Sequence, residues 1–87
     1  MKLKYDFEIV EIDGETVAVP VGGASNGFSA MIKLNETAAE IFNMLSCDVT
    51  EEDIVLKLSN IYNEEKSVLA SFVHEYLDEL KKADILE

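Results

Sequence analysis

The spacing of apolar residues changes near residue 35, and this change limits the folds open to the chain. In the first segment, Tyr5, Phe7 and Ile9 alternate with the acidic Asp6 and Glu8. That two-residue period is typical of a strand with one solvent-exposed face. After residue 35 the apolar residues recur every three or four positions, which is the period of an amphipathic helix. The sequence therefore predicts strands first and helices afterwards, in an α+β fold.

The first two strands are predicted to form a hairpin. Asp13 and Gly14 lie between two apolar runs, and an Asp-Gly pair in that position is a strong signal for a two-residue turn. The alternation weakens at Val10 and Ile12, which predicts that the end of the first strand is covered on both faces. Pro20 has no N–H to donate, so it should lie near the end of the second strand.

A glycine-rich loop and a third strand are predicted to follow. The loop, residues 22–27, lacks the Gly-Lys-Ser/Thr ending of a phosphate-binding loop and is not expected to bind phosphate. The third strand is expected over residues 28–34. One of its faces carries Phe28, Ala30, Ile32 and Leu34, and the other carries Ser29, Met31 and Lys33.

Three helices are predicted in the remaining sequence. Asn35 is expected to cap a helix over residues 36–45. Thr50, three residues before Asp53, should form a capping box for a second helix that ends near residue 62. The third helix is the longest, about 65–82, and an apolar tail folds back after it. The expected apolar positions are Ala38, Ile41, Phe42 and Leu45 in the first helix, Ile54, Val55, Leu58, Ile61 and Tyr62 in the second, Val68, Leu69, Phe72, Val73, Tyr76, Leu77 and Leu80 in the third, and Ile85 and Leu86 in the tail.

This order of elements predicts a winged helix-turn-helix variant with its strands placed first (β-β-β-α-α-α). A chain of 87 residues has room for one hydrophobic core. We therefore expect a single domain over residues 1–87.

The charge of the chain excludes several classes of partner. Seven basic residues, all lysines, stand against 18 acidic ones, so the formal net charge is −11. Nucleic-acid binding depends on cationic groups that contact phosphates, so neither nucleic acid nor an anionic membrane surface is an expected partner. No stretch approaches the roughly 20 apolar residues of a membrane span. We expect a cytoplasmic protein.

The residues that could carry catalysis are few. Cys47 and His74 are the only cysteine and histidine, and they fall on different predicted elements. Nucleophilic catalysis would require a base beside the thiol and an oxyanion hole. We therefore expect no enzyme activity, no metal and no cofactor, with Cys47 packed as a small apolar residue and His74 in solvent or at a groove rim.

Three segments resemble the PqqD family, pyrroloquinoline quinone biosynthesis protein D. They are residues 34–45 (LNETAAEIFNML), the Thr50-to-Tyr62 helix with its Asp-Ile pair, and the last helix and tail from Val73 to Leu86. The resemblance extends over about residues 7–86, and residues 34–39 are its most specific part. The chain departs from the family pattern in three places: Phe72 replaces an Asp, Asp84 replaces a Gly, and residues 46–48 replace an Asp-Gly.

The resemblance implies a peptide chaperone, also called a recognition element for ribosomally made and modified peptides. Such a module binds the leader segment of a precursor peptide as an added strand. It then presents the peptide to a modifying enzyme, commonly a radical S-adenosylmethionine (SAM) maturase with iron–sulfur clusters. At Asp84, an Asp can adopt the left-handed conformation that a Gly would supply.

The residues themselves favour the same mode of binding. A strand at a sheet edge leaves backbone groups unpaired, and residues 28–34 contain no proline that would block a guest strand. With about 4 to 6 backbone hydrogen bonds and one or two apolar anchors, less the cost of ordering the peptide, we expect a roughly micromolar Kd or slightly tighter binding. The predicted peptide-binding residues are Ser29, Ala30, Met31, Ile32 and Lys33 on the strand, and Leu69, Phe72 and Tyr76 on the third helix.

Two other interpretations remain open. The helical trio is also compatible with a winged-helix protein-interaction or regulatory subunit that does not bind DNA. The three helix residues assigned to the site could equally belong to the core.

Overall fold

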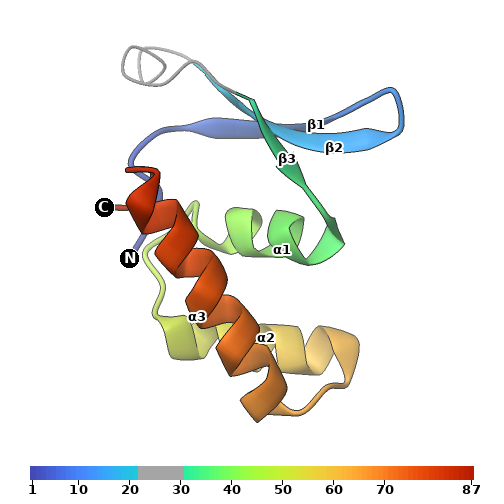
Figure 1. Ribbon diagram of the computed structural model, residues 1–87, viewed down its shortest axis with the longest axis vertical. Coiled ribbons are helices and arrows are strands. Elements are labelled where there is room, and N and C mark those ends of the chain that lie inside the picture. Colours follow the sequence, from blue (N-terminus) through green and yellow to red (C-terminus); the bar gives the residue numbers. More distant parts are fainter. Residues whose placement is uncertain (22–30) are drawn as a thin grey trace.

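The computed structural model describes residues 1–21 and 31–87 and has the predicted order of elements (Figure 1). Three strands come first and three helices follow. The elements are β1 (Phe7–Ile12), β2 (Glu15–Pro20), β3 (Ile32–Leu34), α1 (Glu36–Met44), α2 (Glu51–Tyr62) and α3 (Lys66–Lys82). Figure 1 shows the sheet at one end of the molecule, α1 next to it and α2 at the other end, with α3 crossing α2 and running past the end of α1.

The predicted hairpin between β1 and β2 is confirmed. Ile12 pairs with Glu15, so the turn contains only Asp13 and Gly14. Both turn residues have positive φ, 53° and 80°, which is the conformation of the turn type that matches the twist of a hairpin. Pro20 is the last residue of β2, as predicted.

The prediction that the end of β1 is covered on both faces is wrong. Ile12 is exposed because it lies beside the hairpin turn, which projects beyond α1 in Figure 1. The helices therefore cover only the other end of the hairpin.

β3 is shorter in the described residues than the predicted strand. The observed strand is Ile32–Leu34, and Met31 lies outside it. Residues 28–30 of the predicted strand and the predicted loop 22–27 lie outside the described residues. The faces agree with the prediction where they can be compared, since Leu34 is buried, Ile32 is half-buried, and Met31 and Lys33 are exposed.

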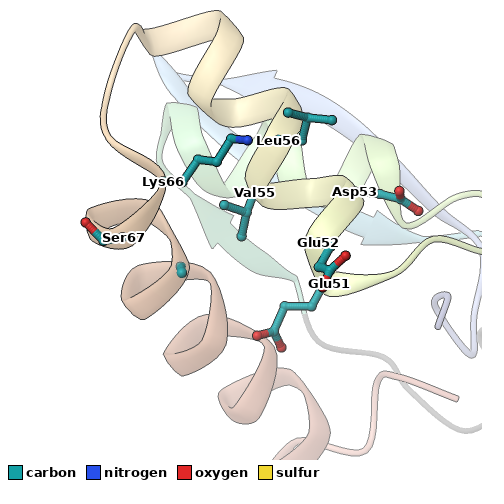
Figure 2. Close-up of a pocket in the computed structure, with 8 residues that line it drawn as sticks. Glu51, Glu52, Asp53, Val55, Leu56, Lys66 and Ser67 are labelled. Atoms are coloured by element: carbon teal, nitrogen blue, oxygen red, sulfur yellow. The ribbon is translucent and has the colours of Figure 1, made fainter.

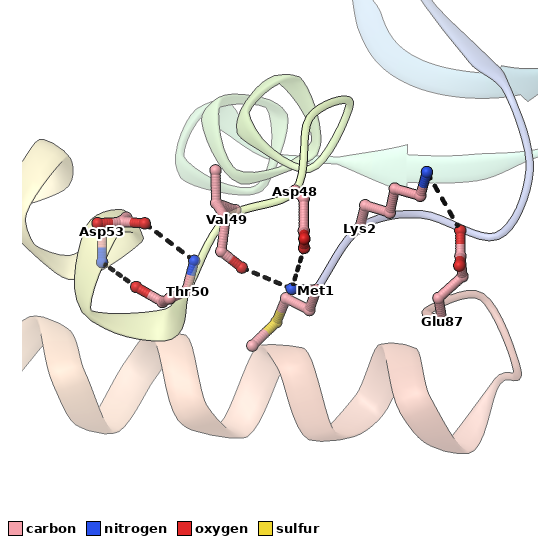
Figure 3. Close-up of polar contacts among 7 residues, drawn as sticks. All are labelled: Met1, Lys2, Asp48, Val49, Thr50, Asp53 and Glu87. Atoms are coloured by element: carbon pink, nitrogen blue, oxygen red, sulfur yellow. Dashed lines mark hydrogen bonds and ion pairs between the residues drawn. The ribbon is translucent and has the colours of Figure 1, made fainter.

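Side-chain caps start the first two helices. The side chain of Asn35 accepts a hydrogen bond from the Ala38 N–H at 2.8 Å. Thr50 and Asp53 form the predicted capping box, with the Thr50 N–H donating to the Asp53 carboxylate and the Asp53 N–H donating to the Thr50 hydroxyl (Figure 3). These bonds satisfy N–H groups that the helix itself leaves free.

The core lies between the sheet and the three helices, and most of the predicted apolar faces contribute to it. The buried residues are Val17, Ala18, Leu34, Ala38, Ile41, Phe42, Leu45, Ile54, Val55, Leu58, Leu69, Val73, Leu77, Leu80, Ile85 and Leu86. Three predictions are wrong: Ile61 and Val68, expected on apolar faces, are exposed, and so is Cys47. Ile61 lies near the end of α2 and Val68 near the start of α3, where the other described elements leave both side chains exposed. Cys47 lies in the surface connection after α1.

The two ends of the chain pack side by side. Leu3 and Leu86 form an isolated antiparallel bridge, and the Met1 ammonium donates to Asp48 and to the Val49 carbonyl at 2.6 and 2.7 Å (Figure 3). Asp84 begins the return of the tail with φ of 61°. This left-handed conformation at Asp84 confirms the prediction for that position.

Candidate functional site

The outer edge of β3 is the first part of the site. The strand order is β1-β2-β3, so β2 is central and β3 lies at an edge. Among residues 1–21 and 31–87, no other strand pairs with that edge. An incoming extended peptide could therefore pair there.

The register identifies which backbone groups face outward. Residues in antiparallel strands direct their N–H and C=O groups to alternate sides. Because the two-residue turn directs Glu15 toward β1, Thr16 is directed toward β3, where it pairs with Leu34. The N–H and C=O of Lys33 then face the free edge, and the same alternation directs those of Met31 outward.

The strand residues of the predicted site fall into two groups. Met31 is 61% exposed, and the Lys33 ammonium lies 3.2 Å from the Glu15 carboxylate. Ile32 is half-buried and packs against the core. Ser29 and Ala30, the other two predicted residues of the strand, lie outside the described residues.

A groove between the start of α1 and α3 is the second part of the site. It has a volume of about 270 Å³ and begins at Asn35, directly after β3. The other residues that line it are Ala38, Phe72, Glu75, Tyr76 and Glu79. The rings of Phe72 and Tyr76 are stacked, with centroids 6.3 Å apart. The groove therefore continues the β3 edge and has an aromatic wall with two carboxylates beside it.

The structure places two of the three predicted helix residues at the groove and the third in the core. Phe72 is 37% exposed and lines the groove beside the half-buried Tyr76. Leu69 is only 7% exposed and packs in the core, so it does not line the groove. Leu69 lies on the same side of α3 as the core residues Val73 and Leu80, because residues four and eleven positions apart share a helix face.

Tyr76 has an unusual environment for a groove residue. Its hydroxyl is buried and has no hydrogen-bond partner among the described residues. Desolvation, with a smaller effect from the Glu79 carboxylate, raises the pKa of Tyr76 to about 12. The ring is therefore neutral at any physiological pH and acts as an apolar surface.

The candidate catalytic residues lie on different elements. His74 is exposed, and its Nδ1 lies 3.4 Å from the Glu51 carboxylate. Cys47 is exposed in the connection between α1 and α2. In the described part of the chain, no group of three or more His, Cys, Asp or Glu side chains could hold a metal ion. Within the same residues, no helix has the length and hydrophobicity to cross a bilayer.

A second pocket, of about 480 Å³, lies between α2 and α3 (Figure 2). Sequence reasoning missed it. The available signal was Leu56, an apolar residue outside the predicted buried positions of α2, which is 49% exposed in the structure.

Comparison with known proteins identifies a family for nearly the whole chain. The family model described as "Coenzyme PQQ synthesis protein D (PqqD)" matches residues 9–86. No curated protein and no solved structure matches the chain.

Proposed function

The chain belongs to the PqqD family, and on this premise we propose that it captures the leader segment of a ribosomally made precursor peptide and presents it to a modifying enzyme. Family membership relates the chain to a peptide-binding protein of coenzyme PQQ synthesis. The finer assignments are our proposal: binding by strand addition at β3, an apolar anchor in the α1–α3 groove, and a radical SAM maturase as the enzyme partner. We also propose that the protein works in the cytoplasm and has no catalytic role.

One observation carries the proposal: the outer edge of β3, with which no other strand of the described residues pairs, leads directly into a partly apolar groove. The outward groups of Met31 and Lys33 can make up to about four backbone hydrogen bonds, each worth about 0.5–1.5 kcal/mol. One or two anchors that each bury on the order of 100 Å² add about 2.5 kcal/mol apiece. After the cost of ordering the peptide, these contributions correspond to a Kd in the micromolar range or weaker.

The side chains of the groove provide the specificity that backbone pairing lacks. Phe72, which stands where the family pattern has an Asp, adds an aromatic surface beside Tyr76. A leader with an apolar side chain at this position would bury that surface. A groove with an acidic residue in place of Phe72 would favour a polar or cationic side chain.

A peptide selected on the protein tests the proposal. A display library of random peptides is selected on the immobilised chain, and an enriched peptide is titrated into isotope-labelled protein while amide signals are followed by NMR. We expect perturbations at residues 31–34 and at the groove residues Phe72 and Tyr76. Perturbations confined to other elements would contradict the proposed site.

A matched pair of variants isolates strand addition. Lys33→Pro removes the outward N–H and leaves the bonds to β2 intact, because proline is tolerated where an edge-strand N–H faces solvent. Lys33→Ala removes the side chain and keeps the N–H. We expect Lys33→Pro to weaken peptide binding at least tenfold and Lys33→Ala to change it little. Equal effects of the two variants would indicate side-chain recognition and argue against an added strand.

The alternative function, a winged-helix regulatory or protein-interaction subunit, makes a different prediction. It requires a folded protein partner and gives no role to the β3 edge. Binding of a folded transcription protein that is insensitive to Lys33→Pro, with no peptide binding at residues 31–34, would favour it.

A further inference from the structure

The pocket between α2 and α3 has an apolar floor that the proposed leader site does not use. Val55 and Ala70 form part of the lining, and Leu56 adds an apolar side chain that is 49% exposed. Figure 2 shows Val55 of α2 directed into the space between the two helices, with Lys66 of α3 reaching toward α2. The pocket is open at the surface, and none of its polar residues is buried, so it lacks the enclosed polar groups that orient a small-molecule ligand.

The rim of this pocket is mainly acidic. Glu51, Glu52 and Asp53 contribute carboxylates, and Lys66 contributes the one cation of the lining. Asp53 is held ionised because a hydrogen bond from the Thr50 N–H lowers the pKa of its carboxyl. The rim thus carries two more negative than positive charges, within a chain whose formal net charge is −11.

The pocket and the leader groove lie on opposite flanks of α3. Ala70 lines the pocket and Phe72 lines the groove, and two residues apart on a helix are separated by about 200° around its axis. Between these flanks, Leu69 and Val73 pack into the core. A protein segment in the pocket would therefore leave the leader groove open.

We propose that the α2–α3 pocket is the docking surface for the modifying enzyme, and that it receives a cationic amphipathic segment of that enzyme. An apolar side chain of the segment contacts Val55, Leu56 and Ala70, and its lysines or arginines face the acidic rim. Charge complementarity selects this occupant, because an acidic or neutral segment would leave the rim carboxylates uncompensated. The inference rests on the proposed function, since it gives the module one surface for the leader and another for the enzyme.

A synthetic amphipathic helix of leucine and lysine is the probe for this surface, and its leucine–glutamate counterpart is the control peptide. Each is titrated into the labelled full-length chain. We expect the lysine peptide to perturb amide signals of residues 51–56 and 66–70, and the glutamate peptide to give no perturbation there. Absence of binding by the lysine peptide, or perturbations spread over the acidic surface, would overturn the proposal.

Two pairs of variants separate a specific pocket from general attraction to an acidic protein. The double variant Glu51→Gln/Glu52→Gln should weaken the lysine peptide about fivefold. Glu8→Gln/Glu11→Gln makes the same change in net charge at exposed residues of β1 that line neither the pocket nor the groove, and it should not weaken the peptide. Leu56→Lys should weaken it about tenfold. Ile61→Lys, at a residue of α2 that is 46% exposed and outside the pocket, should have little effect. Equal losses within either pair would overturn the assignment.

A competition experiment on the wild-type chain tests this inference separately from the proposed function. With the library-selected peptide saturating residues 31–34, the lysine peptide should still bind with unchanged affinity. Competition between the two peptides would overturn the separate docking surface and leave leader binding intact. If the chain binds the lysine peptide at the pocket but no library peptide binds at β3, the proposed function is overturned instead.

Discussion

Alanine substitutions at Leu69 and Phe72 should separate the core face of α3 from its groove face. Leu69 is 7% exposed and Phe72 is 37% exposed on the same helix. Leu69→Ala leaves a cavity in the core, and we expect it to lower the free energy of unfolding by about 2.5–5 kcal/mol. Phe72→Ala removes a ring that is already partly in solvent, so its cost to stability should be smaller, about 1–2 kcal/mol.

The effect on peptide binding should be reversed. A phenylalanine side chain has on the order of 200 Å² to bury; with 37% of Phe72 exposed, a peptide anchor can cover roughly 75 Å² more. At about 25 cal/mol per Å² this is worth about 2 kcal/mol, or roughly a 25-fold change in Kd. We therefore expect Phe72→Ala to weaken the library-selected peptide by about five- to 25-fold, and Leu69→Ala to change the Kd little under conditions where it is folded.

Urea denaturation followed by circular dichroism measures the first quantity, and calorimetric titration with the selected peptide measures the second. If Phe72→Ala destabilises the protein as much as Leu69→Ala and leaves the Kd unchanged, Phe72 is a core residue and the groove has no anchor there.

Three further predictions concern local structure. Gly14→Ala should destabilise the chain by about 1 kcal/mol in urea denaturation, because Gly14 has φ of 80° and the cost is backbone strain alone, with no atom within 4 Å of the added Cβ. Thr50→Ala should also cost about 1 kcal/mol, because it removes the side-chain cap of α2; Ser in its place should restore the stability. The third prediction concerns acid. Hydrogen bonds from Thr50, mainly that of its backbone N–H, lower the pKa of Asp53 from its ordinary value. The contribution of this carboxylate to stability is therefore present above about pH 4 and is lost as the pH falls through the lowered pKa. The urea midpoint of the wild type should consequently fall more steeply on acidification than that of Asp53→Asn.

Each of these has a distinct contrary result. Unchanged stability of Gly14→Ala would mean that the turn adopts another conformation. Loss of stability in Thr50→Ser equal to that in Thr50→Ala would mean that the hydroxyl does not cap α2. If the urea midpoints of Asp53→Asn and the wild type fall equally with pH, the Asp53 carboxylate does not contribute to the loss of stability in acid.

Local signals predicted the elements well because each signal acts within a few residues. The Asp13-Gly14 pair set the hairpin turn, and Asn35 and Thr50 set the starts of two helices. The left-handed residue at Asp84 was also predictable, since few residue types adopt that conformation readily.

The sequence did not predict how much of each helix surface the neighbouring elements cover. Leu69 and Val68 belong to the same apolar stripe in the sequence, yet Leu69 is buried and Val68 is exposed. The helical period shows which side of a helix is apolar. It does not show how much of that side the neighbouring helices cover. For the same reason, the sequence did not distinguish the core residue Leu69 from the groove residue Phe72, and its sign of the pocket between α2 and α3 was a single apolar residue, Leu56.

The modest affinity expected of the β3 edge has a consequence for timing. The described part of β3, Ile32–Leu34, offers a guest only a few backbone contacts, and a Kd in the micromolar range with an association rate constant of about 10⁵–10⁷ M⁻¹s⁻¹ gives a dwell time of about 10 s or less. A brief dwell is compatible with the proposed role, in which the protein hands one peptide to an enzyme and is then free to bind the next.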